Sequence, residues 1–224
     1  MFNAKIYDVL IPTRYEVFDD ILMVSSDFNS ITIGQMMMKR LVDLLIGSIG
    51  MLISLPFILV VAIAIKLEDG GPVFFKQQRI TRYNTMFDVY KLRSMKVNAS
   101  IEEAKKDDDR ITKVGKIIRK LRIDELPQFI NILKGDMSIV GPRPDNMYIK
   151  SQIIDDMPQY DYRVKVKGGL TGYAQIYGKY NTHPSQKLIF DLEYINNYSV
   201  WKDIQLIFQT LTVFFKKDST EGFD

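Results

Sequence analysis

Two adjacent carboxylates, Asp124 and Glu125, have neighbours that suit phosphoryl chemistry. They follow residues 110–123, in which six of fourteen residues are Lys or Arg, and they precede a Gly-Pro-Arg-Pro turn that carries Arg143. Mg²⁺ binds carboxylate oxygens together with substrate phosphate oxygens, and arginine side chains stabilise the phosphate charge that remains. The pattern therefore predicts a phosphate-handling site around Asp124 and Glu125.

The residues after this pair predict the helix that positions it. Apolar side chains recur with helical spacing at Leu126, Phe129, Ile130 and Leu133. Pro127 is tolerated near a helix start, and Gly135 is a typical C-terminal stop. We therefore expect Asp124 at the N-terminus of a short helix, with Gln128 on the same polar face. Simple capping stays open as an alternative, because acidic residues at a helix start also favour the helix dipole.

The composition limits the classes of protein and of site. With 224 residues, 46% of them hydrophobic and 25% charged, the chain predicts a globular fold of one or two domains. A formal net charge of +3 is too small to indicate nucleic acid, so we expect no nucleic-acid partner. The sequence has no cysteine and a single histidine, His183, which excludes disulfides, Cys-ligated metals and multi-His metal sites. Catalysis should therefore depend on carboxylates and cations.

Residues 41–65 form an apolar run that is long enough to enter a membrane. They contain one charge, Asp43, and about 20 apolar residues suffice to cross a bilayer. Ser54 and Pro56 predict a break, with the Ser54 hydroxyl bonded to a carbonyl that the proline frees. Cations, which favour the cytoplasmic side, lie at both ends of the run, at Lys39, Arg40 and Lys66. These features favour a re-entrant helix, while a Pro-kinked spanning helix and a buried core helix stay open.

The rest of the chain predicts an α+β fold that is mainly helical, with one small β-hairpin. The hairpin is expected from strands at 73–80 and 86–93, with Lys91 on one strand face. A basic amphipathic pattern at 113–121 and an aromatic-rich helix at 200–215 fit helices at a membrane interface or ordinary surface helices. We therefore expect an N-terminal extension at 1–35, a re-entrant helix–break–helix element at 36–67 and a cytoplasmic catalytic domain at 68–224.

Several short motifs follow one another from about residue 36 to the end of the chain. They include Lys91-Leu92-Arg93-Ser94-Met95, Asp124-Glu125-Leu126-Pro127-Gln128, Lys134-Gly135-Asp136-Met137-Ser138, Gly141-Pro142-Arg143-Pro144 and Gly169-Leu170-Thr171-Gly172-Tyr173-Ala174-Gln175. In this order the motifs resemble those of the bacterial sugar transferase family, the monotopic phosphoglycosyl transferases. The chain is expected to correspond to members without the four-helix membrane domain of the family's long members.

The resemblance implies a reaction and a role for each site residue. The reaction is the transfer of a sugar-1-phosphate from a UDP-sugar to undecaprenyl phosphate with release of UMP, which initiates the assembly of exopolysaccharide, capsule, O-antigen or another glycoconjugate. Asp124 is implied as the nucleophile that forms a phosphosugar intermediate. Glu125 is implied to help bind Mg²⁺ or to assist deprotonation of the acceptor phosphate, and both carboxylates are implied as Mg²⁺ ligands. Phosphate contacts are implied for Lys91, Arg119, Gln128 and Arg143.

The resemblance also implies a location and partners. The helix with its break at Ser54 and Pro56 is similar to the family's re-entrant membrane helix, which places the catalytic domain on the cytoplasmic face of the bacterial inner membrane. UDP-sugar, undecaprenyl phosphate and membrane lipids are the implied partners, and a homodimer stays open. Thr81 and Thr85 stand where the family usually has glycines, so the tip of the hairpin is expected to differ.

Two other functions are consistent with the same residues. A membrane-anchored scaffold would bind anionic lipids through residues 110–122 without turnover, and its binding would weaken at high salt. A direct sugar transferase would use the same donor but release UDP instead of UMP. The nucleotide released from a panel of UDP-sugars therefore distinguishes these three functions.

Overall fold

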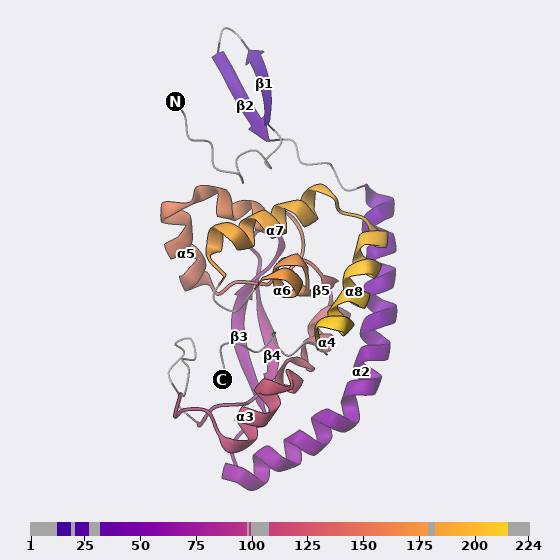
Figure 1. The fold of residues 1–224 in the computed structure, drawn as a ribbon, viewed down its shortest axis with the longest axis vertical. Coiled ribbons are helices and arrows are strands. Elements are labelled where there is room, and N and C mark those ends of the chain that lie inside the picture. The colour runs from indigo at the N-terminus through magenta and orange to yellow at the C-terminus, as the bar shows by residue number, and fades with distance from the viewer. Residues whose placement is uncertain are drawn as a thin grey trace.

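A long helix, α2 (Ile33–Asp69), lies along one edge of a mostly helical domain in the computed structural model (Figure 1). The structure describes residues 13–18, 21–26, 32–97, 99, 108–178 and 182–214. Within these residues the strands form three two-stranded sheets. The expected α+β class, mainly helical, is confirmed, but the described residues form three small sheets where the sequence predicts a single β-hairpin.

One hairpin precedes α2, and short strands and helices follow it. In chain order they are β1 (Thr13–Phe18), β2 (Ile21–Ser26), β3 (Phe74–Ile80), η1 (Arg82–Asn84), β4 (Met86–Leu92), α3 (Lys113–Lys120), η2 (Ile123–Glu125), α4 (Gln128–Lys134), β5 (Ser138–Val140), α5 (Met147–Asp156), η3 (Pro158–Lys165), β6 (Gly169–Thr171), α6 (Tyr173–Tyr177), α7 (Pro184–Asn196) and α8 (Val200–Phe214). In the expected extension at 1–35, the described part includes the antiparallel pair β1 and β2. Its other residues up to 31, and residue 215 of the predicted last helix, lie outside the described part.

The ends of α2 are set by local capping. The backbone N–H of Gln35 donates to the Thr32 side chain, and the backbone N–H of Thr32 donates to the Gln35 side chain, which completes a capping box. The helix ends at Gly70, whose φ of 70° is a left-handed conformation that glycine adopts without a side-chain clash. One apolar helix therefore extends over the whole region in which the sequence predicts a membrane element.

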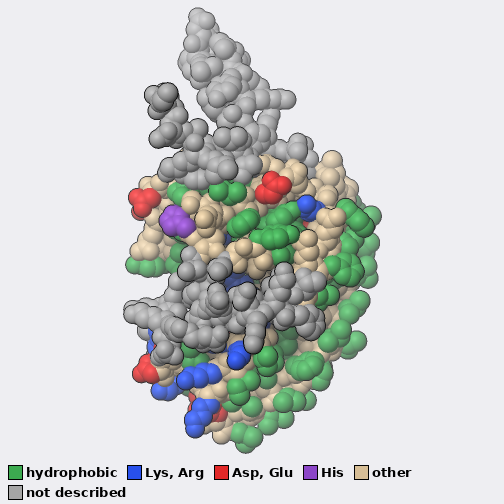
Figure 2. All heavy atoms as spheres, in the orientation of Figure 1, with side chains coloured by type: hydrophobic (Ala, Val, Ile, Leu, Met, Phe, Trp, Pro, Cys, Tyr) green, Lys and Arg blue, Asp and Glu red, His purple; other side chains and the backbone are tan. Residues whose placement is uncertain are grey.

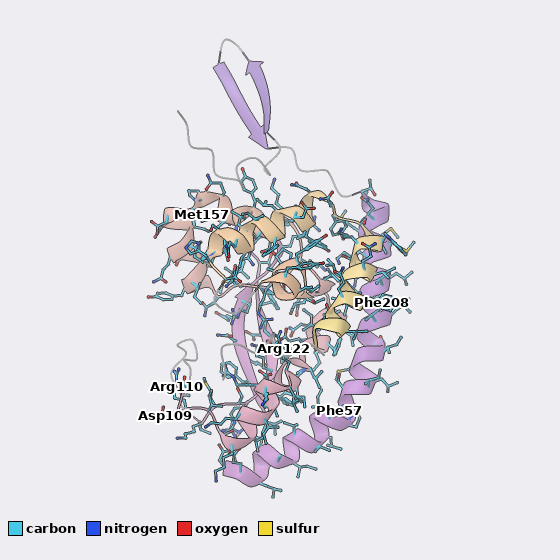
Figure 3. The ribbon with its side chains drawn as sticks, viewed as in Figure 1. Phe57, Asp109, Arg110, Arg122, Met157 and Phe208 are labelled. Carbon is cyan, nitrogen blue, oxygen red and sulfur yellow. The ribbon has the colours of Figure 1, made fainter. Side chains whose placement is uncertain are left out.

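The bend in α2 lies at the proline that is predicted to interrupt it. Pro56 is inside the helix, and Figure 3 shows Phe57 where the axis turns. The Ser54 hydroxyl donates to the Gly50 carbonyl at 2.6 Å, and this kind of bond to position i−4 favours bending. The expected bond from Ser54 to a carbonyl freed by Pro56 is wrong, because the freed carbonyl belongs to Leu52. The helix bends but is not interrupted, because proline removes only one of its hydrogen bonds.

One face of α2 packs against the domain along the whole helix. The buried residues recur at helical spacing, which places them on one side: Lys39, Asp43, Gly47, Ser54, Ile58, Val61 and Ile65. The outer faces expose large apolar side chains, among them Leu52 at 75% and Leu67 at 82% exposure, and Figure 2 shows a hydrophobic edge here. By length and composition α2 can cross a membrane. Lys39, Asp43 and Ser54 are nevertheless buried against the domain.

Charged residues in the first half of α2 attach it to the domain. Arg40 donates two hydrogen bonds of 2.7 Å to carbonyls at the C-terminal end of α4, where helical donors are missing. Asp43 accepts two hydrogen bonds of 2.9 Å from β5. Lys39 donates to Asp203 of α8 at 2.6 Å and to the Val140 carbonyl at 3.0 Å. These bonds hold α4 and β5, which are joined by the turn at residues 135–137, against α2.

Strands β3 and β4 form the expected antiparallel hairpin, with Ile80 opposite Met86 at its closed end. At the tip, Tyr83 has a left-handed φ of 56°. Thr81 and Thr85 have φ values of −122° and −67°, which any residue adopts. Glycine is therefore not needed at these two positions, and the departure from the family's glycines leaves the hairpin unstrained there.

The parallel pairing of β5 with β6, in which Ser138 lies opposite Gly169, is not predicted by the sequence pattern. α5 and η3 connect the two strands. A side chain at Gly169 would bring its Cβ within 2.1 Å of the Gly141 backbone nitrogen, so the close approach needs glycine. The turn after β5 therefore lies beside the turn after β6, at the carboxyl ends of parallel strands, where α/β folds place ligands.

The main hydrophobic core joins the hairpin, α4 and β5 to the last two helices. Its most buried members include Ile132, Val140, Tyr194 and Leu206, each no more than 1% exposed. A second cluster lies between η3 and α7, and a third packs the second half of α2 against β4 and α3. The elements that carry the candidate site are therefore fixed by packing on several sides.

Candidate active site

Asp124 and Glu125 lie in η2, a short 3₁₀ turn directly before α4. The N–H groups in this turn donate to carbonyls three residues back. α4 begins at Gln128 after Pro127, and it ends at Gly135 with a left-handed φ of 94°. The predicted position at a helix start is confirmed to within one turn, and the predicted stop is confirmed. Pro127 follows the pair as the N-cap residue of α4.

Arg122 turns the chain between α3 and η2. Its φ of 54° is a left-handed conformation that residues other than glycine seldom adopt. Figure 3 shows Arg122 near the junction of α3 with the hairpin and α4, and η2 packs against β4. The turn directs the carboxylate pair toward Lys91 of β4, whose Nζ lies 3.7 Å from Oε1 of Glu125.

Glu125 is held by two cations. Arg143 Nη2 donates to its Oε1, and Arg143 Nη1 donates to its Oε2 at 3.5 Å. The Glu125 side chain is 15% exposed. Burial favours the neutral form, but Arg143 and Lys91 favour the charged form and hold the pKa of Glu125 well below its ordinary value. Glu125 is therefore a paired anion and a poor proton acceptor at neutral pH.

Asp124 has the opposite environment. It makes no hydrogen bond or ion pair within the part of the chain that the structure describes. Burial, followed by the negative charge of Glu125, raises the pKa of Asp124 to about 6, although Lys91, Arg119 and Arg143 oppose the rise. Asp124 is thus mainly ionised at pH 7, yet its oxygens are not engaged. A carboxylate in this state is available to attack a phosphorus atom.

Among the described residues, five cations act electrostatically on the pair or on its lysine neighbour: Arg79, Lys91, Arg119, Arg122 and Arg143. Together with Asp124 and Glu125 they form what we call the carboxylate site. Its excess of positive charge suits a substrate that carries several phosphate charges. The structure thus brings the predicted Lys91, Arg119 and Arg143 to the carboxylate pair.

Two members of the carboxylate site, Arg79 and Arg122, are not predicted from the sequence. Arg122 carries a usable signal, because it is the last cation of the basic run and lies two residues before Asp124. Arg79 carries no such signal in its spacing. It lies on β3, and its charge reaches Lys91 only because the hairpin brings the two together.

Gln128 and Asn131 share the predicted polar face of α4 but differ in their partners. Gln128 is 3% exposed, and its amide has no hydrogen bond to another described residue, so it is available to a substrate oxygen. Asn131 is fully buried, accepts from the Tyr90 N–H at 3.0 Å and donates to the Asp88 carbonyl at 2.7 Å. Asn131 therefore joins α4 to β4 and fixes the backbone beside Lys91.

Helix α3 carries Arg119 toward the pair and is itself positioned by α2. The Glu68 carboxylate accepts from two N–H groups in the first turn of α3, at 2.7 and 3.2 Å, which the helix dipole favours. Ile118 is 2% exposed and packs on the end of α2, while Ile117 and Leu121 are 61% and 57% exposed. α3 therefore has an inner face that supports the site and an outer face that is apolar and basic.

The two carboxylates fit a Mg²⁺ ion that takes the rest of its ligands from substrate. In phosphoryl-transfer sites Mg²⁺ is held by one or two carboxylates together with phosphate and water oxygens. Asp124 offers unengaged oxygens, whereas Glu125 shares its oxygens with Arg143. Among the residues that the structure describes, no group of three or more acidic or histidine side chains forms a complete metal cage. The donor set therefore matches a metal that arrives with the substrate phosphates.

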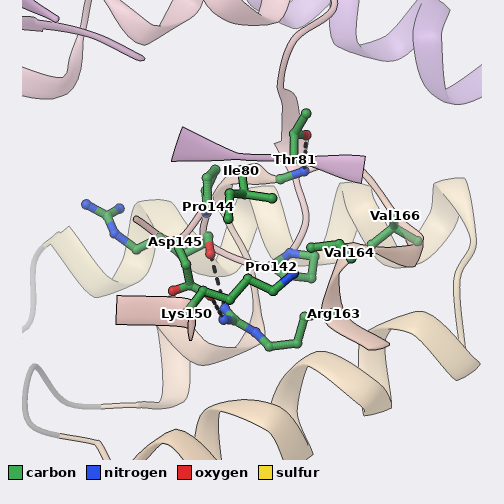
Figure 4. Close-up of a pocket in the computed structure, with 11 residues that line it drawn as sticks. Ile80, Thr81, Pro142, Pro144, Asp145, Lys150, Arg163, Val164 and Val166 are labelled. Carbon is green, nitrogen blue, oxygen red and sulfur yellow. Dashed lines mark hydrogen bonds and ion pairs between the residues drawn. The ribbon is translucent and has the colours of Figure 1, made fainter. Parts of the chain in front are cut away.

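A pocket lies next to the turn that carries Arg143 (Figure 4). It shares Arg143 with the carboxylate site but is lined by neither Asp124 nor Glu125. Asp145, Lys150 and Arg163 contribute its charged side chains, and Figure 4 marks an interaction between Asp145 and Arg163. The pocket is thus lined by residues that belong to the turn or support it, and not by the carboxylate pair.

Comparison with known proteins gives a consistent result. A family model described as bacterial sugar transferase matches residues 34–217. A UDP-N-acetylgalactosamine-undecaprenyl-phosphate N-acetylgalactosaminephosphotransferase from Aeromonas hydrophila is 43% identical over 179 residues, which cover 77% of this chain and 42% of the relative. A UDP-glucose:undecaprenyl-phosphate glucose-1-phosphate transferase from Escherichia coli K12 is 42% identical over 186 residues, covering 80% and 40%.

A third relative is nearer to the chain in length. A UDP-glucose:undecaprenyl-phosphate glucose-1-phosphate transferase from Caulobacter vibrioides is 35% identical over 189 residues, which cover 81% of this chain and 71% of that protein. By contrast, the chain spans less than half the length of the first two relatives. The similarity in all three cases includes most of this chain.

Proposed function

Because the chain belongs to the bacterial sugar transferase family, we propose that it transfers a sugar-1-phosphate from a UDP-sugar to undecaprenyl phosphate and releases UMP. The names of the three relatives describe sugar-phosphate transfer to undecaprenyl phosphate from UDP-activated donors. Transfer of this kind would initiate the assembly of a polysaccharide or another glycoconjugate. The membrane-type helix and the cationic carboxylate site supply what such a reaction requires.

One observation carries the proposal: of the two adjacent carboxylates, one is paired with cations and the other is not. Glu125 is paired with Arg143 and Lys91, whereas Asp124 has no described partner and a pKa raised to about 6 by burial and by Glu125. A purely capping role gives no reason to keep an unpaired carboxylate inside a cluster of cations. A nucleophile that must approach a negatively charged diphosphate needs this arrangement.

In the first step, an Asp124 oxygen attacks the phosphorus atom that bears the sugar. The bond between this phosphorus and the bridging oxygen breaks, and its electron pair leaves with the UMP phosphate. The product is an aspartyl phosphosugar. Arg119, Lys91 and Arg143 stabilise the negative charge on the transferring and leaving groups, which is the main catalytic contribution in phosphoryl transfer.

In the second step, a phosphate oxygen of undecaprenyl phosphate attacks the same phosphorus atom. The acyl phosphate bond breaks, the Asp124 carboxylate is regenerated, and the sugar is left on a lipid diphosphate. The low pKa of Glu125 makes it a poor base, so we assign it the task of orienting Arg143 and not that of removing a proton. Gln128 is placed to contact a phosphate or sugar oxygen.

Asp124 and Glu125 would hold Mg²⁺ during the reaction. Bound there, the ion would neutralise charge on the donor diphosphate and favour departure of UMP. This role is compatible with the unengaged oxygens of Asp124.

The packing of α2 supports a re-entrant arrangement. Its buried face contacts α4, β5 and α8 in the first half and α3 and β4 in the second half. A crossing helix would carry these charged elements into the bilayer, which is costly. We therefore place the outer apolar face in one leaflet, with the bend near Pro56 inside it. The catalytic domain would lie at the cytoplasmic face of the inner membrane, where a soluble UDP-sugar and a lipid phosphate can meet.

The released nucleotide tests this function. Purified protein in membrane mimetic is incubated with Mg²⁺, undecaprenyl phosphate and a panel of UDP-sugars, and UMP and UDP are separated. The proposal predicts UMP with at least one donor, in amounts equal to the lipid-linked sugar-1-phosphate formed. Release of UDP would indicate a direct sugar transferase. Salt-sensitive binding to anionic vesicles without nucleotide release from any donor would indicate a scaffold.

A further inference from the structure

A buried arginine, Arg163 of η3, contacts the turn that carries Arg143. It is 4% exposed, and its Nη2 donates to the backbone carbonyl of Arg143 at 3.1 Å. Its Nη1 is paired with the Asp145 carboxylate, two residues farther along the same turn. The two ends of one guanidinium therefore hold two points of a five-residue turn, at residues 141–145 (Figure 4).

The other contacts of Arg163 fix its own orientation. Its Nε donates to Asp191 of α7 at 2.5 Å, and its Nη1 also donates to the Tyr160 hydroxyl. Asp191 and Tyr160 are each 1% exposed. What we call the Arg163 cluster consists of four residues: Tyr160, Arg163 and Asp191 from the core, and Asp145 from the turn. The contacts with Asp191 and Tyr160 thus fix the orientation of the guanidinium that contacts the turn.

The ends of the turn are held by backbone bonds, but the Arg143 side chain is not. At the first end the Gly141 N–H donates to the Thr171 carbonyl at 2.9 Å, and at the other end the Asp145 carbonyl accepts from the Ile80 N–H at 3.0 Å. The Arg143 side chain is 43% exposed and reaches Glu125 across a gap of eighteen positions in sequence. Whether that reach ends at Glu125 therefore depends on the direction of the backbone at Arg143.

We infer that Arg163 is a positioning residue for the reaction: it fixes the backbone at Arg143 and Asp145 so that the Arg143 guanidinium binds Glu125 and leaves Asp124 unengaged. This inference rests on the proposed function for its kinetic consequences. The contacts themselves are independent of that function. A buried ion pair is weak support for stability alone, because desolvation offsets much of the attraction. Two donors aimed at one turn are better explained by a need for geometry.

The test uses Arg163→Lys, which keeps the positive charge but loses the forked geometry that reaches two points of the turn. We expect kcat for UMP release to fall by about 10- to 100-fold, as a small misplacement of a catalytic group does, with a smaller change in KM for the UDP-sugar. The same substitution in an Arg143→Ala background should cost less than about twofold, because the group that it positions is already gone. A cost that is equal in both backgrounds would overturn the inference.

A matched control is Lys150→Met. Lys150 is 3% exposed, lines the same pocket and is paired with Asp161 at 2.5 Å, but it has no bond to the turn. Arg163→Lys and Lys150→Met are compared at temperatures equally far below their own unfolding temperatures. We expect Lys150→Met to keep a kcat near that of the unsubstituted protein. An equal loss of kcat in both variants would show a merely structural role and would contradict the inference.

A second measurement separates this inference from the proposed function. If the unsubstituted protein releases no UMP from any donor, the proposed function fails, but positioning is still measurable in unfolding. The destabilisation caused by Glu125→Gln is measured in the unsubstituted protein and in the Arg163→Lys variant, by thermal unfolding in detergent. Positioning predicts that the two substitutions are not additive, because both act on the Arg143–Glu125 pair. Additive effects would overturn it.

Discussion

Two charged clusters meet at the turn of residues 141–145, and they differ in how far their positive and negative charges are matched. The carboxylate site has more cations than anions, and its Asp124 has no described partner. The Arg163 cluster has one arginine for two aspartates, is buried except at Asp145, and each of its charges is hydrogen-bonded. Unmatched charge at a partly buried position leaves a place for substrate, whereas matched charge in the interior fixes geometry.

Burial has the same effect on one aspartate of each cluster, but the two aspartates differ in their contacts. In both clusters burial raises the pKa of one aspartate to about 6, Asp124 in the first and Asp191 in the second. Asp191 is bonded directly to Arg163, so its charge serves the fold. Asp124 is only within electrostatic reach of its cations, so its charge is free to react. The contact, and not the pKa, distinguishes the two roles.

The largest effect is expected at Asp124 itself. Asp124→Asn removes the nucleophile while keeping its shape, and UMP release should fall by about 10⁴-fold or more, the scale of losing a covalent catalytic group. Glu125→Gln is the matched comparison, since it removes the neighbouring charge but leaves the nucleophile. If Asp124→Asn kept more than a tenth of the turnover, the distinction between the two carboxylates would be lost.

A smaller but still large loss is expected from Arg143→Ala. This change removes the cation that pairs with Glu125 and that would stabilise charge on the phosphates, so kcat should fall by about 10²- to 10³-fold. Arg143→Lys should recover part of the loss, because it restores the charge without the two-point contact. Equal activity of the Ala and Lys variants would show that charge at this position does not matter.

The pH dependence should follow the raised pKa of Asp124. Its protonated form cannot attack phosphorus, so kcat/KM in the acidic range should fall about tenfold for each pH unit below about 6. An ordinary carboxyl would give the same decline only below about pH 4. The measurement is an initial-rate profile of UMP release between pH 4.5 and 8, with the protein checked for unfolding at each pH. A flat profile down to pH 5 would contradict the environment assigned to Asp124.

The smallest effects are in stability, and they should have opposite signs in the two clusters. The folded-state pKa of Asp124 lies above its unfolded value, so Asp124 contributes stability below about pH 4 that is lost as the pH rises through about 6. Asp124→Asn should therefore stabilise the fold at pH 7.5, by on the order of 1–3 kcal/mol, and the gain should disappear near pH 4. The measurement is unfolding in detergent without Mg²⁺.

In the Arg163 cluster we expect the opposite sign, although the pKa of Asp191 is raised to the same value, because the loss of Asp191 leaves the buried Arg163 with one charge partner fewer. Asp191→Asn removes the carboxylate that orients Arg163, and it should destabilise the fold by on the order of 1–3 kcal/mol at pH 7.5. Its effect on UMP release should be smaller than that of Arg163→Lys, because the two donors to the turn remain. Stabilisation by Asp191→Asn together with destabilisation by Asp124→Asn would invert the comparison between the clusters.

The sequence predicts the local parts of this architecture well. The spacing of apolar residues around Pro127 and Gly135 predicts the short helix and its end, and alternation predicts the hairpin that carries Lys91. These features depend on neighbours within a few positions, which periodicity describes.

The missed features depend on contacts between distant segments. Arg79 reaches the carboxylate site only through the hairpin, and the parallel pairing of β5 with β6 joins residues separated by α5 and η3. The bend at Pro56 is also predicted, but the helix continues through it without the expected break, and Ile58 and Val61 beyond the proline pack on the domain. Residues 163–167 look like a basic run, yet Arg163 is buried by partners from two other elements.

The most direct test of the proposed chemistry is detection of the covalent intermediate. The protein is incubated with Mg²⁺ and its best UDP-sugar without undecaprenyl phosphate, quenched, and mapped by peptide mass spectrometry. We predict a mass increase of one sugar-phosphate on Asp124, released when undecaprenyl phosphate is added, and absent in Asp124→Asn. UMP formation at full rate with no adduct, or an adduct on a residue other than Asp124, would contradict the claim that the unpaired carboxylate is the nucleophile.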